Sequence, residues 1–159
     1  MAPVPRYGRI PKRKIAPDPV YNSVLVQKFI NKMMMGGKKS KVESIFYLAM
    51  LEINKKTGKE PLAVFEKAME NACPLLEVKA RRVGGATYQV PVEISKDRAQ
   101  ALAMQWLRQG ARVRGGKSMV HNMADELIDA FNNIGAAIKN RETLHKTAEA
   151  NKAFAHFRW

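Results

Sequence analysis

The sequence is poor in the features that mark secreted, membrane-spanning and metal-binding proteins. It holds one cysteine, Cys73, among 159 residues, so an internal disulfide framework and a CxxC zinc site are both excluded. It has no run of about 18 apolar residues, which a membrane-spanning helix would need. The first residues also lack the apolar stretch of a secretory signal. We therefore expect a cytoplasmic protein, with an organellar source left open.

Groupings of catalytic or metal-binding side chains are equally scarce. No pair of carboxylates and no set of His, Cys, Asp and Glu has the spacing of a catalytic or metal site. His121 and Asp125 stand four residues apart near Ser118, which indicates an ion pair on a helix surface with Ser118 as N-cap, rather than a catalytic triad. The run from Gly36 to Ser40 lacks the GxxxxGK[ST] spacing of a phosphate-binding loop. We expect no enzyme activity, no cofactor and no metal.

Positive charge, by contrast, is abundant and unevenly placed. Lys and Arg number 28 and Asp and Glu number 14, which gives a formal net charge of +14. Residues 1–41 contain ten cations and one acid, Asp18, and residues 108–117 contain four cations and no acid. Residues 125–129 are acidic instead. This asymmetry predicts one face that binds a polyanion and another that does not.

The hydrophobic pattern predicts a mainly α-helical protein with one protruding two-stranded β-ribbon. We expect a basic extended arm at 1–20, which holds five of the eight prolines, a single helical domain at 21–153 and an aromatic, basic tail at 154–159. The ribbon is expected at about 75–94, where apolar and polar residues alternate on either side of Gly84-Gly85. The body should have five or six helices, at about 22–35, 40–57 and 61–73, from 95, from 118 and at 140–152.

Some residues predict how these helices begin and pack. The second helix is expected to open with a capping box formed by Ser40 and Glu43. The helix from Ser118 is expected to bury an apolar stripe that reaches Ile134. Trp106, in the helix before it, shares a face with other apolar residues and is expected in the core.

Three basic regions are candidates for nucleic-acid contact, because Lys and Arg neutralise phosphates and release counterions. The first is the arm together with the first helix and the turn after it. The second and third are the two ends of the helix from 95, the latter with the loop behind it. Their cations are Arg6, Arg9, Lys12, Arg13, Lys14, Lys28, Lys32, Lys38, Lys39, Lys41, Lys96, Arg98, Arg108, Arg112, Arg114 and Lys117.

The ribbon and the tail are further candidates, each with a purely structural alternative. The ribbon could be a basic finger or a plain hairpin packed on the body, and its Gly-Gly turn allows positive φ and close backbone approach. Its candidate residues are Lys79, Arg81, Arg82, Val83, Gly84, Gly85, Ala86 and Thr87. The tail could anchor on the body or meet nucleic acid or a neighbouring protein. Its candidate residues are Phe154, Phe157, Arg158 and Trp159.

Several long sequence words also occur in a specific order along nearly the whole chain. They include Asp18-Pro19-Val20-Tyr21-Asn22-Ser23, Arg81-Arg82-Val83-Gly84-Gly85-Ala86 and Ala148-Glu149-Ala150-Asn151-Lys152-Ala153-Phe154. Through these words the chain resembles one family, bacterial-type small ribosomal subunit protein seven. It departs from the family after the ribbon, where several arginines are usual and this chain has Ser95-Lys96-Asp97-Arg98-Ala99. A strong RNA contact is therefore not expected at Asp97 or Ala99.

The resemblance implies a specific role. Such proteins bind the three-prime major domain of small-subunit ribosomal RNA, nucleate assembly of the subunit head, and lie near exit-site transfer RNA and the messenger exit channel. By position, the basic regions would hold ribosomal RNA, the ribbon would approach transfer RNA, and the tail would meet RNA or a neighbour. The implied partners are these RNAs and ribosomal proteins of the head and platform, with no membrane and no homo-oligomer in the working state.

Other functions fit the sequence less well. A nucleoid or transcription-regulating DNA-binding protein would need a recognition helix, usually in a symmetric dimer, and no helix-turn-helix pattern is evident. A peripheral membrane protein would need a basic amphipathic helix, and Phe29 and Met33 in the nearest candidate are better used as core. A nuclease would need clustered carboxylates or histidines. The preference for RNA over DNA rests on the resemblance and not on charge.

Overall fold

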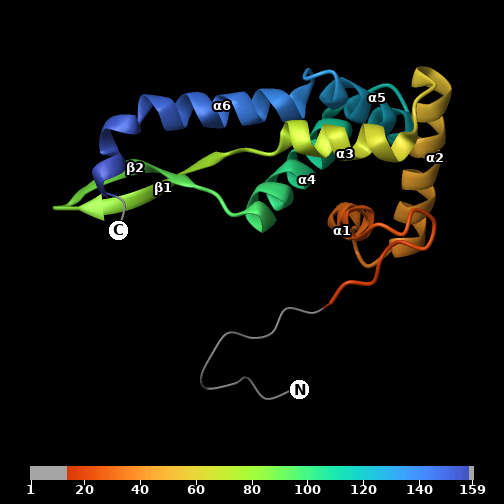
Figure 1. The fold of residues 1–159 in the computed structure, drawn as a ribbon, viewed down its shortest axis with the longest axis horizontal. Helices are drawn as coiled ribbons and strands as arrows, with labels where there is room; N and C mark the ends of the chain where they lie inside the picture. The colour runs from red at the N-terminus through yellow and green to blue at the C-terminus, as the bar shows by residue number, and fades with distance from the viewer. Residues whose placement is uncertain (1–13, 158–159) are drawn as a thin grey trace, which may run out of the picture.

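A computed structural model describes residues 14–157 as a helical body from which a ribbon and one long helix extend together (Figure 1). The predictions for Arg6, Arg9, Lys12, Arg13, Arg158 and Trp159 lie outside the described residues. The elements are α1 Val24–Met33, α2 Lys39–Thr57, α3 Pro61–Ala72, β1 Leu76–Val83, β2 Ala86–Glu93, α4 Lys96–Val113, α5 Met119–Phe131, α6 Ala136–Ala150 and the 3₁₀ helix η1 Lys152–Phe157. The predicted class, a mainly α body with one two-stranded ribbon, is confirmed.

The core of the body lies between α1 and α5 and is built around three phenylalanines. Phe29, Phe46 and Phe65 are fully buried, and their ring centroids lie 5.3–5.8 Å apart with tilted or edge-to-face planes. Because residues three, four and seven apart share a helix face, α1 buries Val26, Phe29, Ile30 and Met33. Its lysines are therefore left on the outer side.

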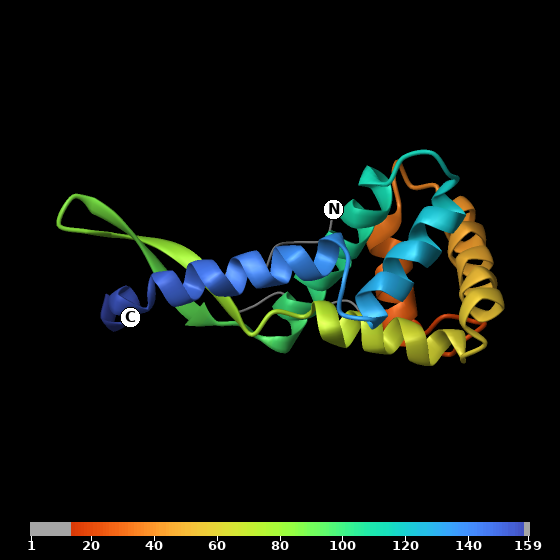
Figure 2. The ribbon, with the colours of Figure 1, turned by 90° about the horizontal axis from the view of Figure 1, so that it is seen from above.

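The ribbon is an antiparallel pair closed by a two-residue turn. Val83 pairs with Ala86, and Gly84 and Gly85 between them have φ of 57° and 88°. Positive φ at both central positions matches the twist of the strands and favours glycine. Figure 2 shows that α6 runs beside the ribbon, away from the other helices. The ribbon is therefore supported along its root by the last helix.

Several predicted boundaries are wrong. The capping box does not form, because α2 begins at Lys39, one residue before Ser40, and no side chain caps it. Helix α5 ends at Phe131, so Ile134 falls in the following turn and is 56% exposed. The last helix starts at Ala136 rather than near 140. Trp106 packs against the core but is only partly buried.

No helix within residues 14–157 is long and apolar enough to cross a membrane.

Candidate nucleic-acid interface

The C-terminal end of α1 is held on α4 by two of the predicted arginines. Arg108 donates to the carbonyl oxygen of Lys32 at 3.2 Å, and Arg112 donates to that of Met33 at 3.1 Å. The last carbonyls of a helix lack partners within the helix, so these bonds satisfy them and match the helix dipole. Burial and the neighbouring Arg108 lower the pKa of Arg112. Both arginines therefore position α1, whatever else they contact.

Lysines around α1 form what we call the open basic face. None of them forms an ion pair with a described residue, although acids do pair with cations elsewhere in the chain. The members are Lys14, Lys28, Lys32, Lys38, Lys41 and Lys96. A cation without an acidic partner keeps its full attraction for a phosphate. The structure thus brings six of the predicted cations to the same side of the protein's helical body.

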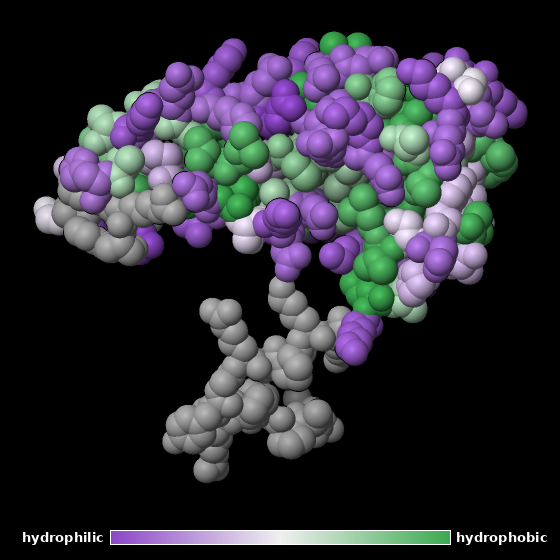
Figure 3. Space-filling view, in the orientation of Figure 1, coloured by the Kyte–Doolittle hydropathy of each residue, from purple (hydrophilic) through white to green (hydrophobic). Residues whose placement is uncertain are grey.

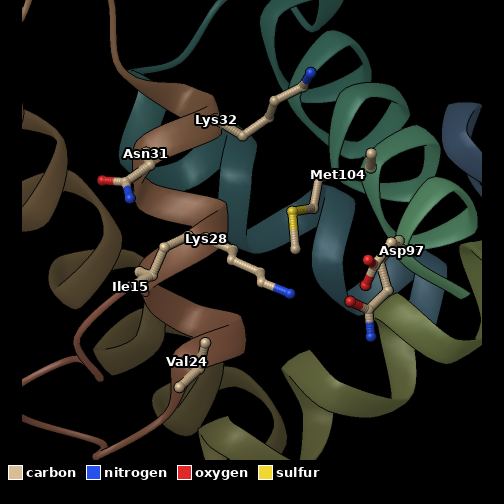
Figure 4. A pocket seen from close by; sticks show the side chains of 9 residues that line it. Ile15, Val24, Lys28, Asn31, Lys32, Asp97 and Met104 are labelled. Carbon is tan, nitrogen blue, oxygen red and sulfur yellow. The ribbon is translucent and has the colours of Figure 1, made fainter. Parts of the chain in front are cut away.

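A hollow of about 540 Å³ lies within this face, between α1 and α4. Its lining is Ile15, Val24, Lys28, Asn31, Lys32, Asp97, Gln100, Ala101 and Met104. Figure 4 shows Lys28 and Lys32 projecting from α1 toward α4, which presents Asp97 and Met104 across the gap. In Figure 3, apolar side chains are exposed beside the point where the described chain begins, which agrees with the exposure of Ile15 and Val24, 40% and 43%. The face therefore combines cations with apolar surface.

A buried carboxylate fixes where the chain enters this face. Asp18 is 1% exposed and accepts hydrogen bonds from the backbone N–H groups of Val20 and Tyr21 at 3.1 and 2.9 Å. It also accepts one from the Tyr47 hydroxyl of α2 at 2.6 Å. Burial, together with this hydrogen bond, raises the pKa of Tyr47. The one acid of residues 1–41 thus anchors the segment that follows the arm.

A second group of predicted cations is paired with acids, in what we call the paired corner: Arg114, Lys117, Lys56, Asp125, Glu126 and Asp129. Arg114 Nε donates to Glu126 Oε2 at 2.8 Å, and its guanidinium also pairs with Asp129. Burial acts to lower the pKa of Arg114, but the bonds to Asp129 and Glu126 outweigh it and raise that pKa. Lys117 Nζ lies 3.1 Å from Asp125, which Lys56 also contacts. These charges are largely neutralised within the protein.

Glu126 is the centre of this corner. It is 0% exposed and also accepts the backbone N–H of Ala137, at the start of α6, at 3.0 Å. Gly110 of α4 leaves the room, since a Cβ there would lie 2.4 Å from Glu126 Oε1. A buried carboxylate needs such partners. It therefore ties α4, α5 and α6 together at one point.

Smaller differences from the predicted site involve local ion pairs. Lys39 pairs with Glu43 at 3.4 Å, and Glu77 pairs with both Lys79 and Arg98 at 3.2 and 3.3 Å. His121 lies 3.9 Å from Glu52 instead of pairing with Asp125, so that predicted ion pair is wrong. Ser118 is the N-cap of α5 by position, although its side chain makes no capping bond.

The ribbon tip is exposed and the ribbon root is covered. Arg82, Gly84, Gly85, Ala86 and Thr87 are all exposed, whereas Val90 is fully buried. Because directly opposed residues share a face, the pairing of Arg82 with Thr87 puts both on the same side of the tip. The basic tip is thus available, while the root serves the fold.

The tail packs on the ribbon at one aromatic. The rings of Phe154 and Tyr88 lie 5.1 Å apart, so η1 is attached to β2. Figure 1 shows the end of α6 turning down past the strands. Phe157 belongs to η1 by its backbone. For Phe154, the structural alternative is therefore realised.

Some candidate residues were not anticipated from the sequence. Asn31, Gln100 and Met104 line the hollow but carry no charge, so no charge pattern marks them. Lys139, Lys146 and Lys152, on α6 and η1, form no ion pair with a described residue, and they were missed because they are scattered among acids. Within residues 14–157 no group of three His, Cys, Asp or Glu could hold a metal ion.

Comparison with known proteins places this chain in a well-populated group. The family profile described as "Ribosomal protein S7p/S5e" matches residues 5–152. A protein of Nitratidesulfovibrio vulgaris named "Small ribosomal subunit protein uS7" is 58% identical over 98% of this chain and all of its own length. Proteins of the same name from Pelotomaculum thermopropionicum and Acidobacterium capsulatum are 59% and 56% identical, again over 98% of this chain and all of theirs.

Proposed function

The chain belongs to the ribosomal protein S7p/S5e family, and from that premise we propose how it acts in the ribosome. It is a structural, non-enzymatic constituent of the small ribosomal subunit and so works in the cytoplasm, on the ribosome. Ribosomal RNA binding is general to this family. The resemblance described from the sequence words is therefore confirmed at the level of the family.

Our proposal is that the open basic face is the main surface for ribosomal RNA. The observation that supports it most is that Lys14, Lys28, Lys32, Lys38, Lys41 and Lys96 have no acidic partner among the described residues. Phosphates would supply the missing counter-charge and release condensed ions on binding. In this way the protein would let RNA helices of like charge pack side by side.

The finer role follows the same reasoning. We propose that the RNA bound is the three-prime major domain, and that binding nucleates the subunit head. The anchor at Asp18 supports a part for the arm, because it fixes the chain next to the face at Ile15. Arg114 and Lys117 were candidates for the same RNA, but their acidic partners favour a structural part for them.

The ribbon tip is proposed to approach exit-site transfer RNA and the messenger exit channel. What supports this is an exposed turn with Arg82 beside it, carried on a root that α6 and η1 hold in place. Changing Arg82 to Ala should weaken transfer RNA in the exit site of assembled subunits and leave ribosomal RNA binding unchanged. Lys139→Ala, on α6, is the matched control. Equal effects of the two changes would contradict this part.

The tail is proposed to contribute to contacts with neighbouring proteins of the head and platform. Phe154 is engaged with Tyr88, so it would present the end of the chain rather than bind RNA itself. Lys152, at the start of η1 and without an acidic partner among the described residues, is available to a neighbour.

The test of the main proposal is a binding measurement across a salt series. The full chain is titrated with three-prime major domain RNA, with scrambled RNA of equal length and with duplex DNA. Tight binding that selects the first RNA and persists at moderate salt is expected. If six to ten phosphates are contacted, affinity should fall roughly 10³- to 10⁵-fold between 50 and 200 mM salt. Equal binding to all three, lost together as salt rises, would favour a nucleoid-type DNA-binding protein instead.

A further inference from the structure

The hollow between α1 and α4 does more than bring cations together. We propose that it is a site for one unstacked nucleobase of the bound RNA, with the phosphates on either side of that base held by Lys28 and Lys32. This inference rests on the proposed RNA-binding function and adds a ligand to a site so far described by its charge alone.

The size and chemistry of the hollow fit a base better than a phosphate. Its volume of about 540 Å³ is within the range of small-molecule sites, roughly 300 to 1,000 Å³. Most of its lining is hydrocarbon, from Ile15, Val24, Ala101 and Met104. A hydrated anion gains little from such walls, whereas the flat face of a base loses unfavourable contact with water there.

One polar group in the hollow has no partner to explain it. Gln100 of α4 is partly buried, and its side-chain amide makes no hydrogen bond to a described residue. An amide offers a donor and an acceptor side by side, which is the pattern that pairs with the edge of a base. Asn31 is different, because its Oδ1 accepts from Gln27 Nε2 at 3.2 Å. Gln100 can thus recognise a base edge without giving up a bond to another described residue.

The two walls divide the work between phosphate and base. Cations come from α1, as Lys28 and Lys32, and Figure 4 shows them directed toward α4. On the α4 wall, Asp97 and Gln100 stand one turn apart, and a carboxylate there disfavours a phosphate. A nucleotide would therefore lie with its phosphate toward α1 and the edge of its base toward α4. Single-stranded loops and bulges, whose bases can be splayed out, supply such a nucleotide.

The experiment separates base recognition from charge. The full chain is prepared as wild type, Gln100→Ala, Ala101→Leu to fill the hollow, and Gln109→Ala as a control exposed on the same helix but outside the hollow. Binding to three-prime major domain RNA is measured over a salt series. Gln100→Ala and Ala101→Leu should bind about 5- to 100-fold more weakly, as expected when one base is no longer recognised, with an unchanged salt slope. Gln109→Ala should bind as wild type does.

A second measurement keeps the inference falsifiable if a variant folds poorly. Base-specific chemical modification of the bound RNA should show an unpaired base that wild type and Gln109→Ala protect and that Gln100→Ala leaves reactive. Unchanged affinity and protection in both hollow variants, while wild type still selects its RNA, would overturn the base site and leave the RNA-binding function standing. Failure of wild type to select that RNA would instead contradict the function itself.

Discussion

The open basic face and the paired corner use the same kinds of side chain for opposite ends. Both derive from basic stretches of the sequence, yet around α1 the lysines have no described acidic partner, and beyond α4 Arg114 and Lys117 meet Asp125, Glu126 and Asp129. Exposed, unpaired cations are available to phosphate, while buried paired ones hold helices together. Charge alone therefore does not identify a binding residue; the acids that fold against it must also be known.

Removing Arg114 should be the largest single break in this comparison. Arg114→Ala leaves the fully buried Glu126 with the Ala137 N–H as its remaining described donor. We expect the free energy of unfolding to fall by about 3 kcal/mol, at the lower end for a broken buried pair because Arg114 is partly exposed. Lys96→Ala, which removes an unpaired cation, should change it by less than about 0.5 kcal/mol. Denaturant melts of both variants measure this, and equal losses would contradict the assignment.

Filling the space beside Glu126 tests the same corner without touching a charge. Gly110→Ala would place a Cβ 2.4 Å from Glu126 Oε1, whereas a Cβ at Gly115 meets nothing within 4 Å. We expect Gly110→Ala to destabilise by about 1–3 kcal/mol through overpacking and Gly115→Ala to be neutral or slightly stabilising. Thermal melts of the pair suffice. A stable Gly110→Ala variant would mean that Glu126 is not confined as described.

The anchor that leads the chain to the open face should be weaker than the corner. Tyr47→Phe removes the hydroxyl that donates to buried Asp18 and leaves its two backbone donors in place. The expected loss is about 1–2 kcal/mol, typical of a hydrogen bond to a charged group. Tyr21→Phe is the control, since no hydrogen bond to Asp18 is formed by its hydroxyl. Comparable losses in both variants would point to ring packing instead.

The smallest effect concerns pH at the rim of the corner. Burial acts to raise the pKa of Asp125, but hydrogen bonds from Lys56 and Lys117 outweigh it and lower that pKa. A lowered folded-state pKa stabilises above the unfolded value, about 3.9, and the gain is lost as pH falls through the folded value. Wild type should thus exceed Lys56→Ala/Lys117→Ala by up to about 1 kcal/mol at pH 7. In unfolding curves at successively lower pH, that gap should close below about pH 4; a constant gap would argue against the pairs.

Much of the fold followed from local pattern. Phe29 and Met33 fell on the buried side of α1 as their spacing predicted, and Gly84-Gly85 formed the predicted turn. The capping box of Ser40 and Glu43 failed because a propensity at a helix start is weak beside tertiary packing, and Glu43 pairs with Lys39 instead.

The candidate site was predictable only in part. The density of cations marked the right segments, but no sequence pattern shows that Glu126, placed twelve residues after Arg114, turns inward to meet it. Long-range pairing of this kind depends on how α4, α5 and α6 cross. The same holds for Gln100, whose importance comes from the hollow that α1 completes.

The most direct test of the comparison uses two double variants that remove equal charge. The slope of log affinity against log salt is measured for the full chain on three-prime major domain RNA, for wild type, Lys28→Ala/Lys32→Ala and Lys56→Ala/Lys117→Ala. Each phosphate that the protein no longer neutralises should reduce the slope by about 1. The account predicts a reduction of about 2 for the open face and less than about 0.5 for the paired corner. Equal reductions for the two would contradict it.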